Sequence, residues 1–223
     1  MAWDLRYPSP APWKPRKEGE EQDDDDHGFL VAPGNYSVSL ARRVDGVRTD
    51  AGKTRSFEVV PLRKGTLPGA SPEALVAYTR ELDALTRSVG AARSAIAESA
   101  REVESIKETL MQSTAGSKLD DETRKLEQRL DRMQAQLDVN RRRDRAGDPG
   151  PISISRRLEI AIYGSRYSTY GPTATHLASV EIAREQLAQL KRDLTRLVMV
   201  DLPALQKDLD AAGVPWTPGR RAP

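Results

Sequence analysis

Four consecutive aspartates and a histidine form the densest group of metal-ligating side chains in this 223-residue sequence. Asp23, Asp24, Asp25 and Asp26 are followed directly by His27. Calcium takes carboxylate oxygens, so the run is a candidate cation site. Consecutive side chains point in different directions, however, whereas calcium loops place their ligands at alternate positions around a glycine turn. The run therefore favours a solvated acidic loop, and we predict no cofactor.

Acid-base and nucleophilic catalysis have few side chains to use. The sequence contains His27, His176 and no cysteine, so any Ser-His-Asp arrangement would need one of these two histidines. His176 is expected in the first turn of a helix, without a nucleophile or an orienting partner near it in the sequence. Neither context matches a nucleophile elbow. We therefore predict that the chain is not an enzyme and has no catalytic residues.

The candidates for phosphate binding are four neighbouring arginines, Arg141, Arg142, Arg143 and Arg145. Interspersed aspartates dilute their charge, and no aromatic residues are interleaved for base stacking. A helix C-terminus, where this cluster is expected, favours cations through its dipole. The formal net charge of the chain is only +2. We therefore predict no nucleic-acid partner.

Tyrosines and glycines gather where a short helix is expected to end. The group comprises Tyr163, Gly164, Tyr167, Tyr170 and Gly171. Aromatic side chains at such a break can stack on sugars or fill a groove between helices. Packing across a helical hairpin is the simpler interpretation, because Tyr163 continues an apolar helix face.

The elements that must position these residues are elongated rather than globular. Hydrophobic residues make up 38% of the chain, aromatic residues 5% and charged residues 30%, a profile that suits paired long helices. No apolar run approaches the roughly 20 residues that span a bilayer, and no signal-peptide pattern is present. The sequence itself therefore predicts no membrane span and leaves the localisation open.

The first third of the chain, residues 1–67, has the alternation of strands. Three segments qualify: Trp3, Leu5 and Tyr7; Tyr36, Val38 and Leu40 after a Pro-Gly turn; and residues 55–62, reached through a glycine-containing connection. Residues 14–28 between the first two are rich in proline and acid, and we predict a disordered loop there. Three strands are too few to close a sandwich.

From residue 71 the periodicity becomes helical. We predict helices over 71–112, 118–145, 153–166 and 173–212, followed by a tail, 213–223, whose one large apolar side chain is Trp216. Heptad-spaced apolar residues in the first two predict an antiparallel hairpin. In the last helix the apolar stripe slips by one place near Pro203, which predicts a local bend.

Several segments, in order along nearly the whole chain, resemble the C-terminal region of bacterial sortilin-like proteins. They are WDLRYP, APGNYSVSLARRVDG, FEVVPL, ISRRLEIAIYGSRYSTYGPT, LASVEIAREQL, DLPALQKDLDAAG and PWTPGR. That family consists of exported proteins built on an Asp-box (BNR-type) β-propeller, often labelled glycosyl hydrolases. The S-x-D-x-G-x-x-W repeat of the propeller is absent here, and the hydrolase label belongs to the propeller.

The resemblance implies an immunoglobulin-like unit whose earlier strands would come from upstream sequence. We therefore expect a separately translated or truncated C-terminal piece with an exposed sheet edge. Its partner would be a protein, a β-propeller or β-sandwich region supplied by another chain or by the missing upstream sequence. The resemblance also implies a periplasmic or extracellular location.

Together these observations predict an α+β, mostly α fold: a small antiparallel, partly immunoglobulin-like β element followed by an elongated antiparallel bundle with a coiled-coil-like hairpin. The predicted function is that of a non-catalytic accessory or docking region acting through protein contacts. The alternatives are a free-standing coiled-coil adaptor that dimerises through the heptad seam and, by family label alone, a glycan-directed hydrolase. The predicted interaction residues are Trp3, Leu5, Tyr7, Tyr36, Val38, Leu40, Tyr163, Tyr167, Tyr170 and Trp216.

Overall fold

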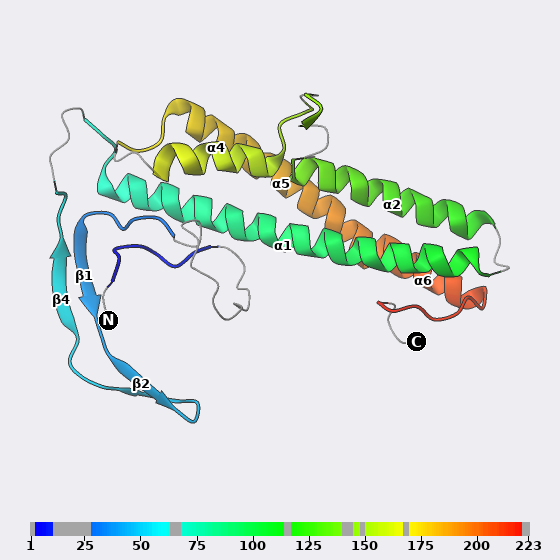
Figure 1. Ribbon diagram of the computed structural model, residues 1–223, viewed down its shortest axis with the longest axis horizontal. Coiled ribbons are helices and arrows are strands. Elements are labelled where there is room, and N and C mark those ends of the chain that lie inside the picture. The colour runs from blue at the N-terminus through cyan, green and yellow to red at the C-terminus, as the bar shows by residue number, and fades with distance from the viewer. Residues whose placement is uncertain are drawn as a thin grey trace.

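The fold is α+β and mostly helical, as predicted. The computed structural model describes residues 3–10, 28–62, 68–113, 117–139, 145–147, 150–166 and 170–219, and the statements below concern these residues. An elongated helical bundle carries a β-ribbon beyond the N-terminal end of its longest helix (Figure 1).

The helical hairpin predicted from the heptad pattern is present. Helix α1 spans Pro72–Met111 and helix α2 spans Ser117–Leu137. Helix α1 begins where the Ser71 side chain accepts a hydrogen bond from the Ala74 N–H at 3.2 Å, an N-cap that satisfies one of the free amides of the first turn. All six predicted seam residues of α2 are buried: Leu119, Thr123, Leu126, Leu130, Met133 and Leu137.

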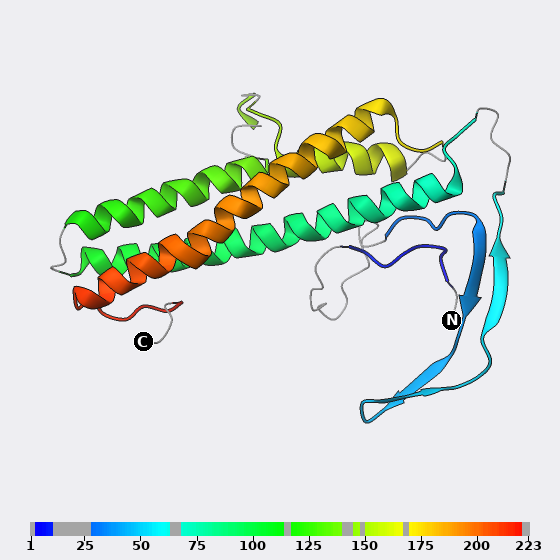
Figure 2. The same ribbon diagram turned by 180° about the vertical axis from the view of Figure 1, so that it is seen from behind.

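The remaining helices complete a three-column bundle. Helix α4, Ile154–Arg166, continues the direction of α2 along α1, and helix α5, Ala174–Arg196, runs back beside both (Figures 1 and 2). A π-helical turn η2, Leu197–Asp201, joins α5 to helix α6, Leu202–Ala211. The columns enclose one core of buried side chains drawn from every helix.

Where the sequence predicted a local bend, the last helix contains a π-helical turn. There the Leu202 N–H bonds the Leu197 carbonyl, five residues back. The apolar seam passes from Leu197 to Leu202 in a step of five, and both side chains are buried. One extra residue in the turn keeps the stripe on the core. Pro203, which has no N–H to donate, lies in the first turn of α6.

The second helix ends earlier than predicted, at Leu137 instead of residue 145. Asp138 leaves the helix, and its carboxylate bonds side chains of α1 and α4. The proline and glycine residues at 149–151 fix only the latest position at which the helix can end. The contacts of Asp138 with α1 and α4 accompany its earlier end at Leu137.

The β element is one long two-stranded ribbon. Strand β1, Gly34–Val38, pairs antiparallel with β4, Arg55–Val59, and farther out β2, Ala41–Val44, pairs with β3, Val47–Asp50. A turn at Asp45 and Gly46, both with positive φ (48° and 81°), closes the ribbon, as expected for an Asp-Gly hairpin. The predicted second and third strands are confirmed as β1 and β4.

The predicted opening strand is wrong. Residues 3–7 make one isolated bridge, between Arg6 and Leu30, and Leu5 has a φ of 59° that no regular strand adopts. Alternating apolar residues indicate a strand because successive side chains point to opposite faces, but a strand also needs a neighbour that supplies regular hydrogen bonds. Here the neighbour is residues 29–31, which bond the segment only through Tyr7 N to Phe29 O and Val31 N to Leu5 O.

Candidate docking surface

The β-ribbon is the most exposed regular structure in the described chain. Every residue from 37 to 58 is exposed, and this stretch includes apolar side chains that normally seek burial. Leu40 and Val47 are each 67% exposed, Val38 is 54% exposed and Val44 is 49% exposed. Within the described residues the outer edges of β1 and β4 pair with no further strand. The ribbon therefore offers free backbone groups and apolar side chains together.

An aromatic cluster fixes the base of the ribbon. Tyr36 and Phe57 are directly opposite in the β1–β4 register, and Trp3 packs against both, with ring centroids 5.6 Å and 5.9 Å away. The Tyr36 hydroxyl donates to the Ala32 carbonyl at 2.7 Å. Burial, followed by the neighbouring Tyr7, raises the pKa of Tyr36, so its hydroxyl remains a donor at neutral pH. Trp3, still 45% exposed, covers this face incompletely.

The opening segment holds Trp3 in place through backbone contacts. The Trp3 indole donates to the Arg6 carbonyl at 3.0 Å, and the Arg6 guanidinium donates to the Gly28 carbonyl at 3.1 Å. Gly28 approaches so closely that an added Cβ would lie 2.2 Å from the Tyr7 carbonyl oxygen. Phe29 and its neighbours then connect the ribbon to the bundle, since Phe29 packs against the helical core.

The described interaction residues fall into three sets: on the ribbon, on the segment that supports it, and on the bundle. Trp3, Tyr36, Val38 and Leu40 belong to the ribbon or lie on it, while Leu5 and the half-buried Tyr7 belong to the segment that supports it. The remaining predicted residues are on the bundle, where the structure does not bring them into the ribbon surface: Tyr163, Tyr170 and Trp216.

The predicted residues on the bundle side are partly exposed. Tyr163 on α4 is 50% exposed. Tyr170 contributes its carbonyl, which accepts a hydrogen bond from the Ala70 N–H at 2.8 Å. Trp216 is exposed beside the buried Val214 of the tail. The other residues considered as candidates lie outside the described residues: Asp23 to Asp26, His27, Tyr167 and Arg141 to Arg143.

His176 has a structural role that accounts for its position. The Thr173 N–H donates to His176 Nδ1 at 3.2 Å and the His176 N–H donates to Thr173 Oγ1 at 3.3 Å, forming a reciprocal cap at the start of α5. Its ring lies against Gly164 of α4, where an added Cβ would come within 2.1 Å of Nε2. The histidine joins two helices.

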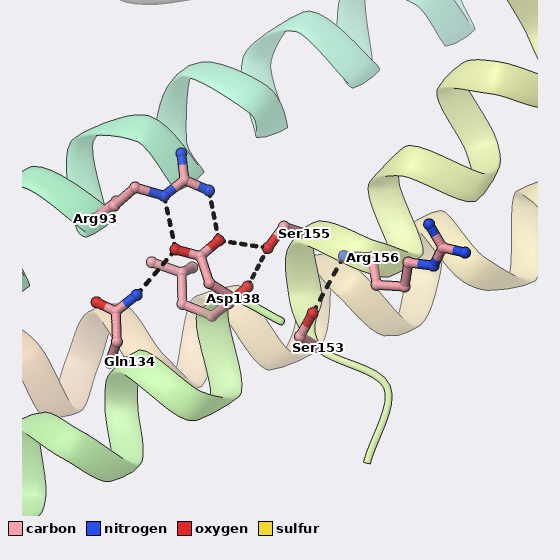
Figure 3. Close-up of polar contacts among 7 residues, drawn as sticks. Arg93, Gln134, Asp138, Ser153, Ser155 and Arg156 are labelled. Carbon is pink, nitrogen blue, oxygen red and sulfur yellow. Dashed lines mark hydrogen bonds and ion pairs between the residues drawn. The ribbon is translucent and has the colours of Figure 1, made fainter. Parts of the chain in front are cut away.

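The most connected polar group in the bundle is also structural. Between α2 and α4, the Asp138 carboxylate accepts hydrogen bonds from two nitrogens of Arg93, Nε at 2.7 Å and Nη2 at 2.5 Å (Figure 3). It also accepts one from Gln134 Nε2 at 3.0 Å. Ser155 Oγ lies 2.6 Å from Asp138 Oδ1 and also bonds the Leu137 carbonyl. These contacts tie the ends of α2 and α4 to α1, as Figure 3 shows.

The lowered pKa of Asp138 argues against its acting as a general base toward the Ser155 hydroxyl. Burial raises the pKa of Asp138, but hydrogen bonds from Arg93 and Ser155 outweigh it and the net pKa is lowered. A carboxylate held by a guanidinium in this way is a weak proton acceptor. The arrangement therefore stabilises the helix junction and does not resemble an activated nucleophile.

The described residues offer neither a metal-binding cluster nor a membrane-spanning helix. They contain no group of three or more His, Asp or Glu side chains placed to hold a metal ion. None of the described helices has the length and apolar character needed to cross a membrane.

Comparison with protein-family models, with curated proteins and with solved structures finds no match to this chain.

Two features of the surface were missing from the predicted site. Phe57 was assigned to a strand face, but its position opposite Tyr36 depends on a register that sequence alone does not give. Strand β3 lies within residues 45–53, the segment predicted as a glycine-containing connection, and β2 directly precedes it; neither was predicted as a strand. The Asp45-Gly46 pair, flanked by Val44 and Val47, is the local signal that could have revealed them.

Proposed function

We propose that the chain is a non-catalytic docking element that binds a partner protein through its β-ribbon, with the helical bundle as a strut. The observation that carries the proposal is the uninterrupted exposure of residues 37–58 on a ribbon with free edges and apolar side chains. A partner strand could add to such an edge through backbone hydrogen bonds, with side-chain contacts providing specificity.

The coiled-coil alternative is less well supported because the heptad seam already has partners. Leu82, Ile96 and Ile106 of α1 are each at most 2% exposed inside the bundle. A dimer through the seam would first have to open this core. The sequence resemblance to sortilin-like C-terminal regions remains a prediction; under it the docked partner is a propeller-bearing, exported protein.

Site-specific photocrosslinking tests the docking surface. A photoreactive phenylalanine analogue is placed at Val38, Leu40 or Val47 on the ribbon, and, as matched controls, at the equally exposed Met111 or Met199 on the bundle. In the producing cells we expect a discrete adduct from ribbon positions. The absence of adducts at every ribbon position, or adducts only from the bundle, would contradict the proposal.

A further inference from the structure

The outer part of the ribbon, residues 40–55 and here called the arm, is strongly basic. It holds five basic and two acidic side chains, a formal charge of +3, whereas the whole chain carries only +2. All of its residues are exposed. The net positive charge of the protein is thus concentrated on an element that has no hydrophobic core of its own.

The arrangement of these charges is unfavourable in the free protein. Arg43 lies directly opposite Arg48 in the β2–β3 register, and like charges in that position destabilise an antiparallel pair. Arg43 Nε makes only a long hydrogen bond, 3.4 Å, to the Gly46 carbonyl. Among the described residues no carboxylate pairs with the arm's cations: Arg42, Arg43, Arg48, Lys53 and Arg55.

Arginines on the bundle show the opposite pattern. Arg93 pairs with Asp138 and Arg129 pairs with Asp201, each at 2.5 Å, and Arg184 pairs with both Glu81 and Glu181. Among the described residues, carboxylates thus lie beside several bundle arginines and beside none of the arm's arginines. A partner that supplies carboxylates to Arg43 and Arg48 would relieve their repulsion, and guanidinium groups bind carboxylates in a bidentate manner.

The other side chains of the arm favour a protein over nucleic acid. Residues 40–55 contain no aromatic side chain on which a base could stack. The exposed Val44–Val47 pair offers apolar contact instead. Pairing of the arms of two copies of the chain is unfavourable, because two arms of the same charge would repel each other.

We propose that the arm binds an acidic protein strand, whose Asp or Glu side chains pair with Arg43 and Arg48 while its backbone joins a free ribbon edge. This inference rests on the proposed docking function and specifies the chemistry of the partner. Arg43 and Arg48 are opposite each other and therefore share a face of the ribbon. Alternate residues of a strand also share a face, so acidic residues at every second position would present their carboxylates on one side of the added strand.

Fluorescence anisotropy with short labelled probes tests this chemistry on the full chain. The probes are a nine-residue peptide alternating glutamate and threonine, the same peptide with glutamine for glutamate, and a short DNA duplex. We expect the glutamate peptide to bind at least tenfold more tightly than the other two. Its affinity should fall at least tenfold in Arg43→Glu/Arg48→Glu, and also fall in the milder Arg43→Gln/Arg48→Gln.

The matched control reverses two cations on the bundle. Lys125 and Arg132 are exposed on α2, so Lys125→Glu/Arg132→Glu changes the net charge equally and should alter the peptide affinity less than twofold. If the control loses as much affinity for the glutamate peptide as the arm variant does, the effect depends only on net charge, and the inference is overturned. Tighter binding of the duplex, with the same dependence on Arg43 and Arg48, would overturn it in favour of nucleic acid.

Failure of the inference can be told apart from failure of the docking function. The crosslinked adduct from the photoreactive residue at Val38 is measured again in the Arg43→Glu/Arg48→Glu variant. If the adduct persists unchanged, the ribbon docks its partner without carboxylate pairing, and only the inference fails. If no ribbon position gives an adduct even in the native sequence, the docking function fails. Loss of the adduct in the double variant, but not in Lys125→Glu/Arg132→Glu, is the expected result.

Discussion

Two carboxylates in this bundle, the buried Asp83 and the half-buried Asp138, experience opposite electrostatic environments. Asp83 on α1 is 9% exposed, and its Oδ1 has no hydrogen-bond partner within the described part of the chain. Burial raises the pKa of Asp83, with Arg87 opposing this effect. Asp138 has a lowered pKa because the hydrogen bonds from Arg93 and Ser155 exceed the cost of burial. The two residues should therefore affect stability with opposite dependence on pH.

The variant Asp83→Asn should be more stable than the native chain at pH 7. A carboxyl with a raised folded pKa costs stability once ionised, and this cost disappears as the pH falls through that pKa toward the ordinary value near 4. We expect a gain of about 1 kcal/mol in the free energy of unfolding, or roughly 2–4 °C in Tm, at pH 7. Thermal denaturation between pH 7 and pH 3.5 checks this, and a gain independent of pH would contradict it.

The variant Asp138→Asn should behave in the reverse sense. A carboxyl with a lowered folded pKa stabilises above its unfolded value near 4, and the contribution is lost as the pH falls through the folded pKa. The Arg93 side chain is 48% exposed and that of Asp138 is 22% exposed, so solvent screening limits the loss at pH 7 to about 1 kcal/mol. Urea unfolding should show the two chains converging below about pH 3. An unchanged difference there would refute the assignment.

At the scale of elements, the predictable features are those encoded by neighbouring residues. The limits of α1 follow from Ser71, Pro72 and the heptad seam, and the structure places the helix at Pro72–Met111, within one residue of the predicted limits. The slip of the apolar stripe near Pro203 correctly indicated the irregularity at Leu197–Asp201. Each signal lies within one or two helical turns of the feature it predicts.

Features that depend on distant partners were missed. The end of α2 depends on Arg93, 45 residues before Asp138 in the sequence, and on Ser155, 17 residues after it. The opening segment has the alternation of a strand, but Leu5 breaks the pairing with residues 29–31. The sequence predicted part of the candidate docking surface, through Trp3 and Tyr36, because large aromatic residues in an alternating pattern are recognisable from the sequence alone. The positions of Phe57 and Arg48 required the strand register.

The π-helical turn should be removable as a unit. Deleting Val200, which is 58% exposed, together with Pro203→Ala restores a regular three-and-four spacing of the buried leucines. We therefore expect a continuous helix and a Tm within a few degrees of the native value. Deleting the exposed Gln189 of α5 is the control, since it rotates half of the helix's apolar stripe away from the core. Equal losses of Tm in both deletions would contradict the explanation of the turn.

At the scale of the whole molecule, the bundle and the ribbon differ in how much of their surface is buried. The bundle buries one core drawn from all of its helices, while the ribbon buries almost nothing of its own between residues 37 and 58. An isolated two-stranded ribbon is marginally stable in water. Its amides should therefore open at low free-energy cost, whereas the amides of the bundle should exchange only through larger unfolding.

Hydrogen–deuterium exchange of the free chain and of its purified crosslinked complex tests the central claim most directly. In the free chain, we predict rapid exchange in residues 39–54 and slow exchange along the buried seam of α1. In the complex, the ribbon amides should become protected while the exposed helix faces remain as they were. New protection confined to the helices, with the ribbon still exchanging rapidly, would contradict the view that this protein docks through its ribbon.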